Sequence, residues 1–288
     1  MTVRGVERVV DRPELELHDL AKVYGQKVVF ENVSLTVGHS EALAIIGPSG
    51  SGKSTLCRVA AGLEPFQRGK VVVGGELFEY ADSRGRVRRG PQFTALRIQV
   101  GTVFQHYTLF RHMTVMQNVM LGPRRVLRCS RMEAKERAEG ALERVAMSRA
   151  AKDYPARLSG GQQQRVAIAR ELAMDRRIIF FDEVTSALDP ELVGEVLSVM
   201  QRLASEGMTM VVVTHEMGFA RHVASQLAVM VDGRIIETGS SESIFASPSQ
   251  ERTRDFLDRV LDSGLSARTS PQVGGAGAGS SMGGEGSE

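Results

Sequence analysis

Short runs of consecutive apolar residues recur along this chain, separated by stretches that are polar or rich in glycine. The clearest runs have the length of buried strands and lie at residues 42–46, 178–181, 210–213 and 227–230. Further strands are predicted at 70–73 and 101–105, and helices at 53–62 and 191–204. Because buried strands that alternate with helices pair in parallel, this order predicts a mainly parallel sheet covered by helices.

The segment before the first buried run follows a different pattern. Residues 15–37 alternate polar and apolar side chains, and Tyr24 and Gly25 interrupt the alternation. A period of two indicates a strand with one buried face, and the interruption indicates a turn. We therefore expect an antiparallel strand pair in this segment.

Between residues 106 and 174 the spacing of the apolar residues becomes helical. Ser130 and Glu133 have the spacing of a capping box, in which each side chain bonds the backbone N–H of the other. Small and apolar residues then follow at helical spacing: Ala134, Ala138, Ala141, Leu142 and Val145. This stretch is predicted to be a helical subdomain.

The two ends of the chain are predicted to lie outside the main domain, which we place at residues 14–262. Residues 1–13 alternate charged and apolar residues and lack the apolar core of a signal peptide, so we interpret them as an extension. Residues 263–288 are mostly Gly, Ser and Ala with no aromatic residue, which predicts a disordered tail. The basic stretch 82–91 is interpreted as a solvated loop.

Composition narrows the classes of function. The chain is 42% hydrophobic and 24% charged, as in a globular protein, and its net charge of +2 gives no reason to expect nucleic acid as a partner. Cys57 and Cys129 are isolated, which argues against a disulfide framework or a zinc site. No run approaches the ~18 apolar residues of a membrane span, so any membrane role is expected to come through another chain.

A glycine-rich loop follows the first buried run and precedes a predicted helix. It fits the phosphate-binding pattern G-x-x-x-x-G-K-[ST] and consists of Gly47, Pro48, Ser49, Gly50, Ser51, Gly52, Lys53, Ser54 and Thr55. Glycines let backbone N–H groups approach phosphate oxygens, and the helix offers its positive end. Lys53 is predicted to contact the β and γ phosphates of a nucleotide, and the Ser54 hydroxyl to bind Mg²⁺. The flanking strand and helix argue against a chance turn.

Two carboxylates end a later buried run. Asp182 and Glu183 follow residues 178–181, and buried carboxylates are costly without a partner. The alternative is a strand end that simply reaches solvent. Next to a phosphate loop, we favour a metal and catalytic site, with Asp182 as a Mg²⁺ ligand and Glu183 polarising the attacking water.

A third stretch, Leu158-Ser159-Gly160-Gly161-Gln162, lies between the first two in sequence. In this order the three stretches resemble the ATP-binding cassette (ABC) ATPases, and the resemblance covers about residues 15–260. It implies an α/β P-loop cassette with a mainly parallel core sheet, an N-terminal antiparallel β subdomain and an inserted helical subdomain. It implies ATP and Mg²⁺ as cofactors. Val184 stands where the family commonly has proline.

The resemblance also implies roles for isolated residues. Gln105 follows a short strand, at the position of the family's glutamine that senses Mg²⁺. The resemblance implies that it both binds Mg²⁺ and takes part in catalysis. His215 matches the family's switch histidine. The resemblance implies that its side chain hydrogen-bonds both the γ-phosphate and Glu183. Tyr24 matches the aromatic residue that stacks on adenine, and a strand-end tyrosine in a turn is the alternative.

The stretch from Ser159 to Gln162 is a second anion site in a chain that already has one. Ser159 is a good N-cap, and Gly160 and Gly161 expose backbone N–H groups. The resemblance implies that each such loop covers the ATP held by another subunit, so a homodimer or paired ATPase is expected with ATP bound. An ordinary capped helix is the alternative.

Residues 104–119 resemble importer ATPases, and residues 215–220 and 251–253 resemble the subgroup that takes up polar amino acids. Arg111 stands where the family often has proline. The resemblance implies integral-membrane permease subunits as partners, a solute-binding protein acting indirectly, and a peripheral position on the cytoplasmic face of the membrane. An export or lipid-handling motor and a non-transport ABC ATPase are the alternatives. One cassette without sustained heptads argues against the non-transport class.

Overall fold

The structure is a computed structural model that describes residues 12–78, 94 and 97–268. The N-terminal segment forms a small antiparallel sheet with the strand order β2-β1-β4-β5. Its strands are β1 (Leu15–Tyr24), β2 (Lys27–Val37), β4 (Arg68–Val73) and β5 (Glu76–Phe78). Tyr24 pairs with Lys27 across the turn, where Gly25 has a φ of 58°. The predicted strand pair is therefore confirmed.

The larger sheet has the order β10-β9-β3-β8-β7-β6. Its strands are β3 (Ala42–Ile46), β6 (Val100–Phe104), β7 (Ile178–Asp182), β8 (Met210–Val213), β9 (Gln226–Val231) and β10 (Arg234–Ser240). All neighbours from β9 to β6 are parallel, and β10 adds an antiparallel edge. The prediction of a mainly parallel sheet is confirmed.

The two faces of this sheet pack against different helices. Ile178 and Phe180 of β7 face the core that includes α1 (Lys53–Ala60) and the small sheet. The alternate residues of β7 face the core that includes α5 (Gly160–Leu172) and α6 (Pro190–Ser205). Because successive side chains of a strand point to opposite faces, α1 and α5 lie on opposite sides of the sheet.

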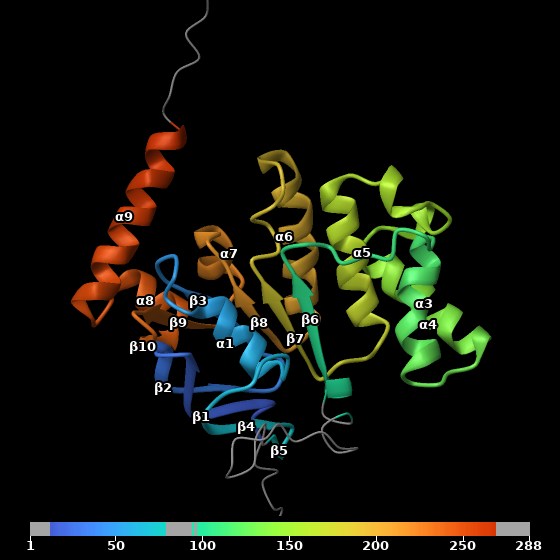
Figure 1. Ribbon diagram of the computed structural model, residues 1–288. Coiled ribbons are helices and arrows are strands. Elements are labelled where there is room, and N and C mark those ends of the chain that lie inside the picture. Colours follow the sequence, from blue (N-terminus) through green and yellow to red (C-terminus); the bar gives the residue numbers. More distant parts are fainter. Residues whose placement is uncertain (1–11, 79–93, 95–96, 269–288) are drawn as a thin grey trace, which may run out of the picture.

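The helical region contains α3 (Val115–Arg125), α4 (Arg131–Arg144), two short 3₁₀ turns (Ser148–Ala150 and Pro155–Arg157) and α5. Figure 1 shows α3, α4 and α5 grouped at one end of the large sheet, beyond β6. The small and apolar row predicted for α4 and its C-cap is buried: Ala134, Ala138, Ala141, Leu142 and Val145.

The capping box predicted at the start of α4 is only half formed. Ser130 accepts the backbone N–H of Glu133. The Glu133 carboxylate instead lies 3.3 Å from both the Cys129 thiol and Arg137. A nearby cation competes with the N-cap N–H for the same carboxylate, which explains the difference.

The C-terminal part adds α7 (Met217–His222), α8 (Ser241–Ala246) and α9 (Glu251–Arg268). Helix α9 extends to Arg268, so our expectation that the disordered tail begins at Ser263 is wrong by several residues. A helix adds residues at little cost once it is nucleated, and Leu265, Ala267 and Arg268 are good helix formers.

Some sequence predictions fall outside the described residues: the extension as far as residue 11, the basic stretch 82–91, and residues 269–288. Within the described ranges, none of the helices has the length and apolar character needed to cross a bilayer.

Candidate functional site

The glycine loop connects the end of β3 to the start of α1, and its backbone requires glycine. Gly47 has a φ of 147°, and a Cβ there would lie 2.0 Å from the carbonyl oxygen of Met230. Gly50 and Gly52 also have positive φ values, 80° and 104°. Only glycine adopts these conformations at little cost, and they turn successive N–H groups toward a common concavity.

Lys53 reaches back along this loop. Its Nζ donates hydrogen bonds to the carbonyl oxygens of Gly47 and Pro48, both at 2.9 Å. Burial lowers the pKa of Lys53, and the nearby carboxylates of Glu183 and Asp182 raise it. An ammonium that has lost most of its water gains strongly from an anionic ligand.

Asp182 ends β7 and is buried. Its Oδ2 lies 3.6 Å from Nη2 of Arg58 on α1, and its Oδ1 has no hydrogen-bond partner among the described residues. Burial raises the pKa of Asp182, whereas a hydrogen bond from Ser54 and the charge of Arg58 lower it. A buried carboxylate oxygen without a donor is suited to a cation.

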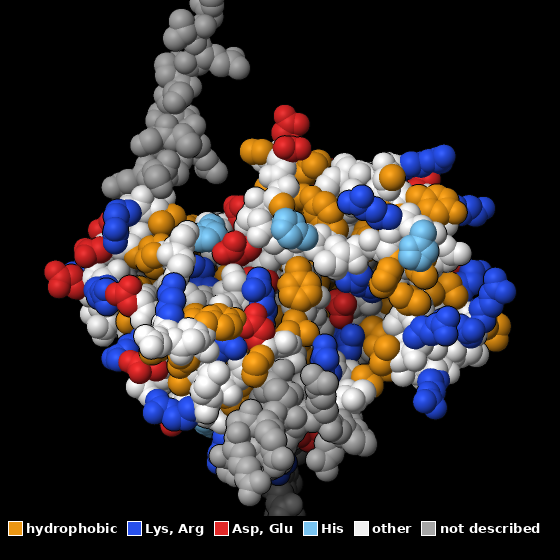
Figure 2. Space-filling view, in the orientation of Figure 1, with side chains coloured by type: hydrophobic (Ala, Val, Ile, Leu, Met, Phe, Trp, Pro, Cys, Tyr) orange, Lys and Arg blue, Asp and Glu red, His pale blue; other side chains and the backbone are white. Residues whose placement is uncertain are grey.

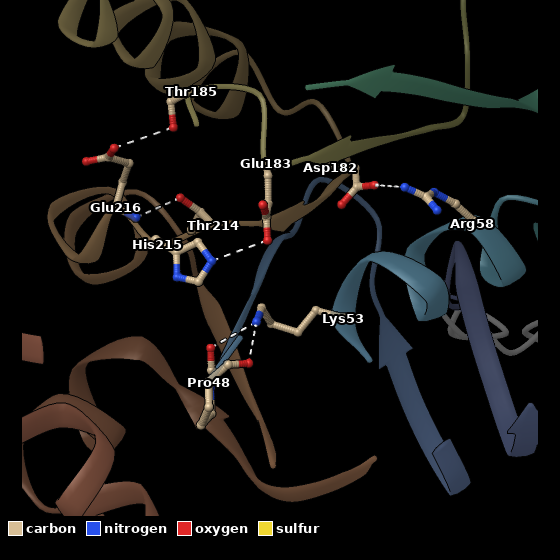
Figure 3. Close-up of polar contacts among 10 residues, drawn as sticks. Pro48, Lys53, Arg58, Asp182, Glu183, Thr185, Thr214, His215 and Glu216 are labelled. Carbon is tan, nitrogen blue, oxygen red and sulfur yellow. Dashed lines mark hydrogen bonds and ion pairs between the residues drawn. The ribbon is translucent and has the colours of Figure 1, made fainter. Parts of the chain in front are cut away.

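Glu183 adopts a left-handed backbone with a φ of 50°, which is uncommon for a residue other than glycine. Its N–H is held by the carbonyl of Val213 at 3.0 Å. Its Oε1 lies 3.2 Å from Nε2 of His215, which follows β8 closely. In Figure 3 the side chains of Glu183, His215 and Lys53 point into the same space.

ATP and Mg²⁺ fit this group of residues. Ser51 Oγ is buried within the loop without a hydrogen-bond partner among the described residues, as is Asp182 Oδ1. The Ser51 hydroxyl can donate a hydrogen bond to a phosphate oxygen, and Asp182 Oδ1 can bind a metal ion. Together with the desolvated Lys53, they match the charge pattern of a magnesium nucleotide.

Gln105 comes directly after β6 and joins the site through strand register. Phe104 pairs with Asp182 in the β6–β7 ladder, so Gln105 and Glu183 leave the sheet side by side. The Gln105 side chain makes no hydrogen bond within the described part of the chain, and it is half-buried. It is therefore free to contact a bound metal ion or its water.

Tyr24 stands at the end of β1 with about half of its side chain exposed. Its hydroxyl donates to Glu64, and Nζ of Lys22 lies 4.4 Å from the ring centroid. The ring is thus fixed at its edge while it still presents an apolar surface. This arrangement is compatible with stacking on a nucleotide base.

The stretch from Ser159 to Gln162 forms the start of α5. Ser159 Oγ accepts the N–H of Gln162 at 3.2 Å, and Gln162 Oε1 accepts the N–H of Ser159 at 3.0 Å. This is a complete capping box. Helix α5, which begins here, and helix α1, which follows the glycine loop, pack on opposite faces of the sheet.

Sequence reasoning missed two charged residues of the site. Arg58 contacts both Asp182 and Glu64, each at 3.6 Å, and Glu64 also accepts the Tyr24 hydroxyl. A network of charges thus connects the base-stacking candidate to the metal-binding candidate. The available signal was a single arginine within the otherwise apolar second half of α1.

Comparison with known proteins agrees with the geometry. Residues 30–186 match the family model described as ABC transporter. This chain belongs to the ABC transporter family, as an ATP-binding cassette. Within the family it is similar to ATP-binding proteins of amino acid transport.

Two such relatives are the glutamine transport protein GlnQ of Geobacillus stearothermophilus and the histidine/lysine/arginine/ornithine transport protein HisP of Escherichia coli. GlnQ is 50% identical over 245 residues, which are 85% of this chain and 98% of GlnQ. HisP is 49% identical over 252 residues, which are 86% of this chain and 98% of HisP.

Solved structures share the fold. The protein cbiO1 from Clostridium perfringens, part of the transporter complex cbiONQ, aligns with a TM-score of 0.72 at 27% identity and covers 89% of this chain and 99% of its own. The cassette MJ0796, a dimer in a post-hydrolysis state bound to ADP and Pi, aligns with a TM-score of 0.67 at 31% identity. It covers 79% of this chain and 99% of its own.

Proposed function

We propose that this chain is the ATP-hydrolysing subunit of an ABC importer for polar amino acids. The observation that carries the proposal is the meeting of Glu183, His215 and Lys53 at one edge of the sheet. Their side chains come from three separate elements, and the Glu183–His215 distance is 3.2 Å. A base, its orienting partner and a phosphate-binding cation are the groups that ATP hydrolysis requires.

In the mechanism, the N–H groups of the glycine loop and Lys53 bind the β and γ phosphates. Ser54, Asp182 and Gln105 would hold Mg²⁺, which neutralises charge on the phosphates when it is bound. Glu183 accepts a hydrogen bond from the attacking water and draws its proton away. His215 holds the Glu183 carboxylate in position and donates toward the γ-phosphate.

The active assembly is proposed to be a dimer with two ATP molecules between the subunits. Helix α1, which follows the glycine loop, and helix α5, which begins at the Ser159–Gln162 stretch, pack on opposite faces of the sheet, and we propose that each phosphate site receives the second stretch from another chain. The dimeric state of the similar cassette MJ0796 supports this arrangement. Each charged hydrogen bond contributes about 1.5–3 kcal/mol, so several per site can drive a weak association.

The dimer can be tested with mixed variants. Chains with Ser159→Ala and chains with Lys53→Ala are inactive separately in this scheme. When mixed, they form a heterodimer with one intact site and one site that lacks both groups. We expect part of the ATPase activity to return on mixing, and its absence despite a heterodimer seen by sizing would contradict the shared site.

The contact with the permease is proposed to lie on residues 107–116. Leu109, Met113 and Met116 are half-buried, and Phe110 is exposed by 42%. Figure 2 shows hydrophobic side chains gathered among Lys and Arg side chains over the helical region. Because this apolar surface lies next to Gln105, a movement of Gln105 on ATP binding would shift the surface and the membrane subunit bound to it.

The substrate class is proposed from the relatives, whose names state that they serve the transport of glutamine, glutamate, histidine and arginine. The test is uptake of these labelled amino acids in cells that lack the gene. We expect uptake of at least one to fall, and to be restored by the wild-type gene but not by Glu183→Gln. Unchanged uptake of all of them, with no permease co-purifying, would reject the proposal.

A further inference from the structure

The guanidinium group of Arg58 lies between two carboxylates. Its Nη2 is 3.6 Å from Oδ2 of Asp182, and its Nη1 is 3.6 Å from Oε1 of Glu64. Both separations are longer than the roughly 3 Å of a direct hydrogen bond. Arg58 therefore forms an ion pair with each carboxylate and is held closely by neither.

The two partners of Arg58 differ in their surroundings. Asp182 is the candidate Mg²⁺ ligand, and its side chain points toward Arg58 in Figure 3. Glu64 is fixed through its other oxygen, Oε2, which accepts the Tyr24 hydroxyl and lies 3.6 Å from Nζ of the buried Lys22. The side chain of Arg58 is 44% exposed, so it has room to move between a metal-binding carboxylate and a stationary one.

Arg58 and Mg²⁺ are both cations, and both interact favourably with the Asp182 carboxylate. A cation that already neutralises part of this charge reduces what a second cation gains there. The same guanidinium offsets the repulsion between Asp182 and the phosphate groups when a nucleotide binds without a metal ion. For both reasons, Arg58 should reduce the difference between nucleotide binding with and without Mg²⁺.

We propose that Arg58 is a positioning residue that sets how strongly nucleotide binding depends on Mg²⁺, because it competes with the metal ion for Asp182 while Glu64 draws it away. The inference rests on the Mg²⁺ site at Asp182 that belongs to the proposed function. The competing interpretation is that the two ion pairs only attach α1 to its neighbours, which would affect stability alone.

The test measures the dissociation constant of a fluorescent, non-hydrolysable ATP analogue, once in EDTA and once in saturating Mg²⁺. The protein concentration is one at which sizing shows a monomer. We call the ratio of the constant in EDTA to the constant in Mg²⁺ the metal effect. A lost contact to the base weakens binding equally in both solutions, so it cancels in this ratio.

The two partners should have opposite effects when they are changed. Arg58→Leu should raise the metal effect by about fivefold, the upper range for an ion pair of this exposure. Glu64→Gln should lower the metal effect, because Arg58 then loses the carboxylate that draws it from Asp182. Arg58→Lys keeps the charge and should stay within about twofold of wild type.

The double variant tests whether Glu64 acts through Arg58. In the Arg58→Leu background, Glu64→Gln should leave the metal effect unchanged. If Glu64→Gln still lowers it there, Glu64 acts on the metal ion by its own charge, and the proposed competition is wrong. The matched controls are Arg144→Leu and Glu206→Gln, which break a partly exposed ion pair of 2.6 Å between α4 and the end of α6. Neither control should change the metal effect.

Asp182→Asn separates this inference from the proposed function. If Asp182→Asn keeps the metal effect of wild type, the proposed Mg²⁺ site is wrong and the inference fails with it. If Asp182→Asn lowers the metal effect while Arg58→Leu leaves it unchanged, Arg58 has only a structural role and this inference alone is overturned. Thermal unfolding shows whether each variant is folded. If Arg58→Leu is not, Arg58→Gln also removes the charge and should change the metal effect in the same direction.

Discussion

Nε2 of His215 lies 3.2 Å from Oε1 of Glu183, although the two residues are 32 positions apart in the sequence. Each follows a different strand of the parallel sheet, and β7 and β8 are neighbours in it. At this contact Glu183 has a left-handed backbone, with a φ of 50°. Such a conformation carries a cost in free energy, and it is commonly found at functional sites.

We expect His215→Ala to lower the rate of ATP hydrolysis by about 10²–10⁴-fold, the range typical for a group that assists proton transfer. ATP binding should change little, because the contact to the glycine loop remains. Single-turnover hydrolysis and a binding titration measure the two effects. His222→Ala is the matched control, since His222 lies exposed at the end of α7. Near-normal turnover of His215→Ala would remove His215 from the mechanism.

Lys53→Ala is expected to weaken nucleotide binding itself. The change removes a charged hydrogen bond to phosphate, which corresponds to about 1.5–3 kcal/mol, or a 10- to 150-fold higher Kd. Equilibrium binding of a fluorescent ATP analogue tests this. The exposed Lys152 provides the control Lys152→Ala. If Lys53→Ala bound ATP normally and failed only in hydrolysis, the assignment of Lys53 to ground-state binding would be wrong.

Gly160→Ala should impair the ATPase because the new Cβ would meet the Tyr107 hydroxyl at 2.7 Å and Leu188 at 3.1 Å. The first clash involves the end of a side chain, so Tyr107→Phe should relieve it in part. We expect the double variant to recover some activity and stability relative to Gly160→Ala. A double-mutant cycle of thermal stability measures the coupling. Simple additivity of the two changes would show that the contact has no energetic weight.

Glu237 should stabilise the start of α9 in a pH-dependent way. Its carboxylate accepts the backbone N–H groups of Ser249 at 2.7 Å and Gln250 at 3.2 Å. Burial alone would raise the pKa of Glu237, but the hydrogen bonds, including those from Ser249 and Gln250, lower it below its ordinary value of 4.5. A lowered pKa in the folded state stabilises the protein above the unfolded pKa, and this stabilisation is lost as the pH falls through the folded pKa.

Glu237→Gln should therefore reduce the free energy of unfolding by about 1 kcal/mol at pH 7. The difference from wild type should shrink as the pH falls below about 4.5, where Glu237 of the unfolded wild-type chain begins to be protonated while the folded chain still holds it ionised. Urea unfolding at several pH values checks this. A difference that did not depend on pH would show that shape rather than charge matters at this position.

The strands and the chemistry of the loops could be predicted from the sequence because both are local properties. A run such as residues 42–46, apolar at every position, is compatible only with burial on both faces. Glycines spaced before Lys53 indicate a loop that approaches phosphate. The missed features were those that lack a local pattern. Arg58 sits in α1 like any helical arginine, and the end of α9 depends on how far a nucleated helix continues.

The sequence alone thus determined which residue types can bind a nucleotide and in what order they occur. It did not determine which of them meet. The β6–β7 register places Gln105 beside Glu183, and the alternation of side chains along β7 puts α1 and α5 on opposite faces of the sheet. These relationships join residues distant in sequence through strand order and packing. A local pattern carries no information about them, so only the tertiary structure decided that Gln105 and Glu183 leave the sheet together and that α1 and α5 cover opposite faces of it.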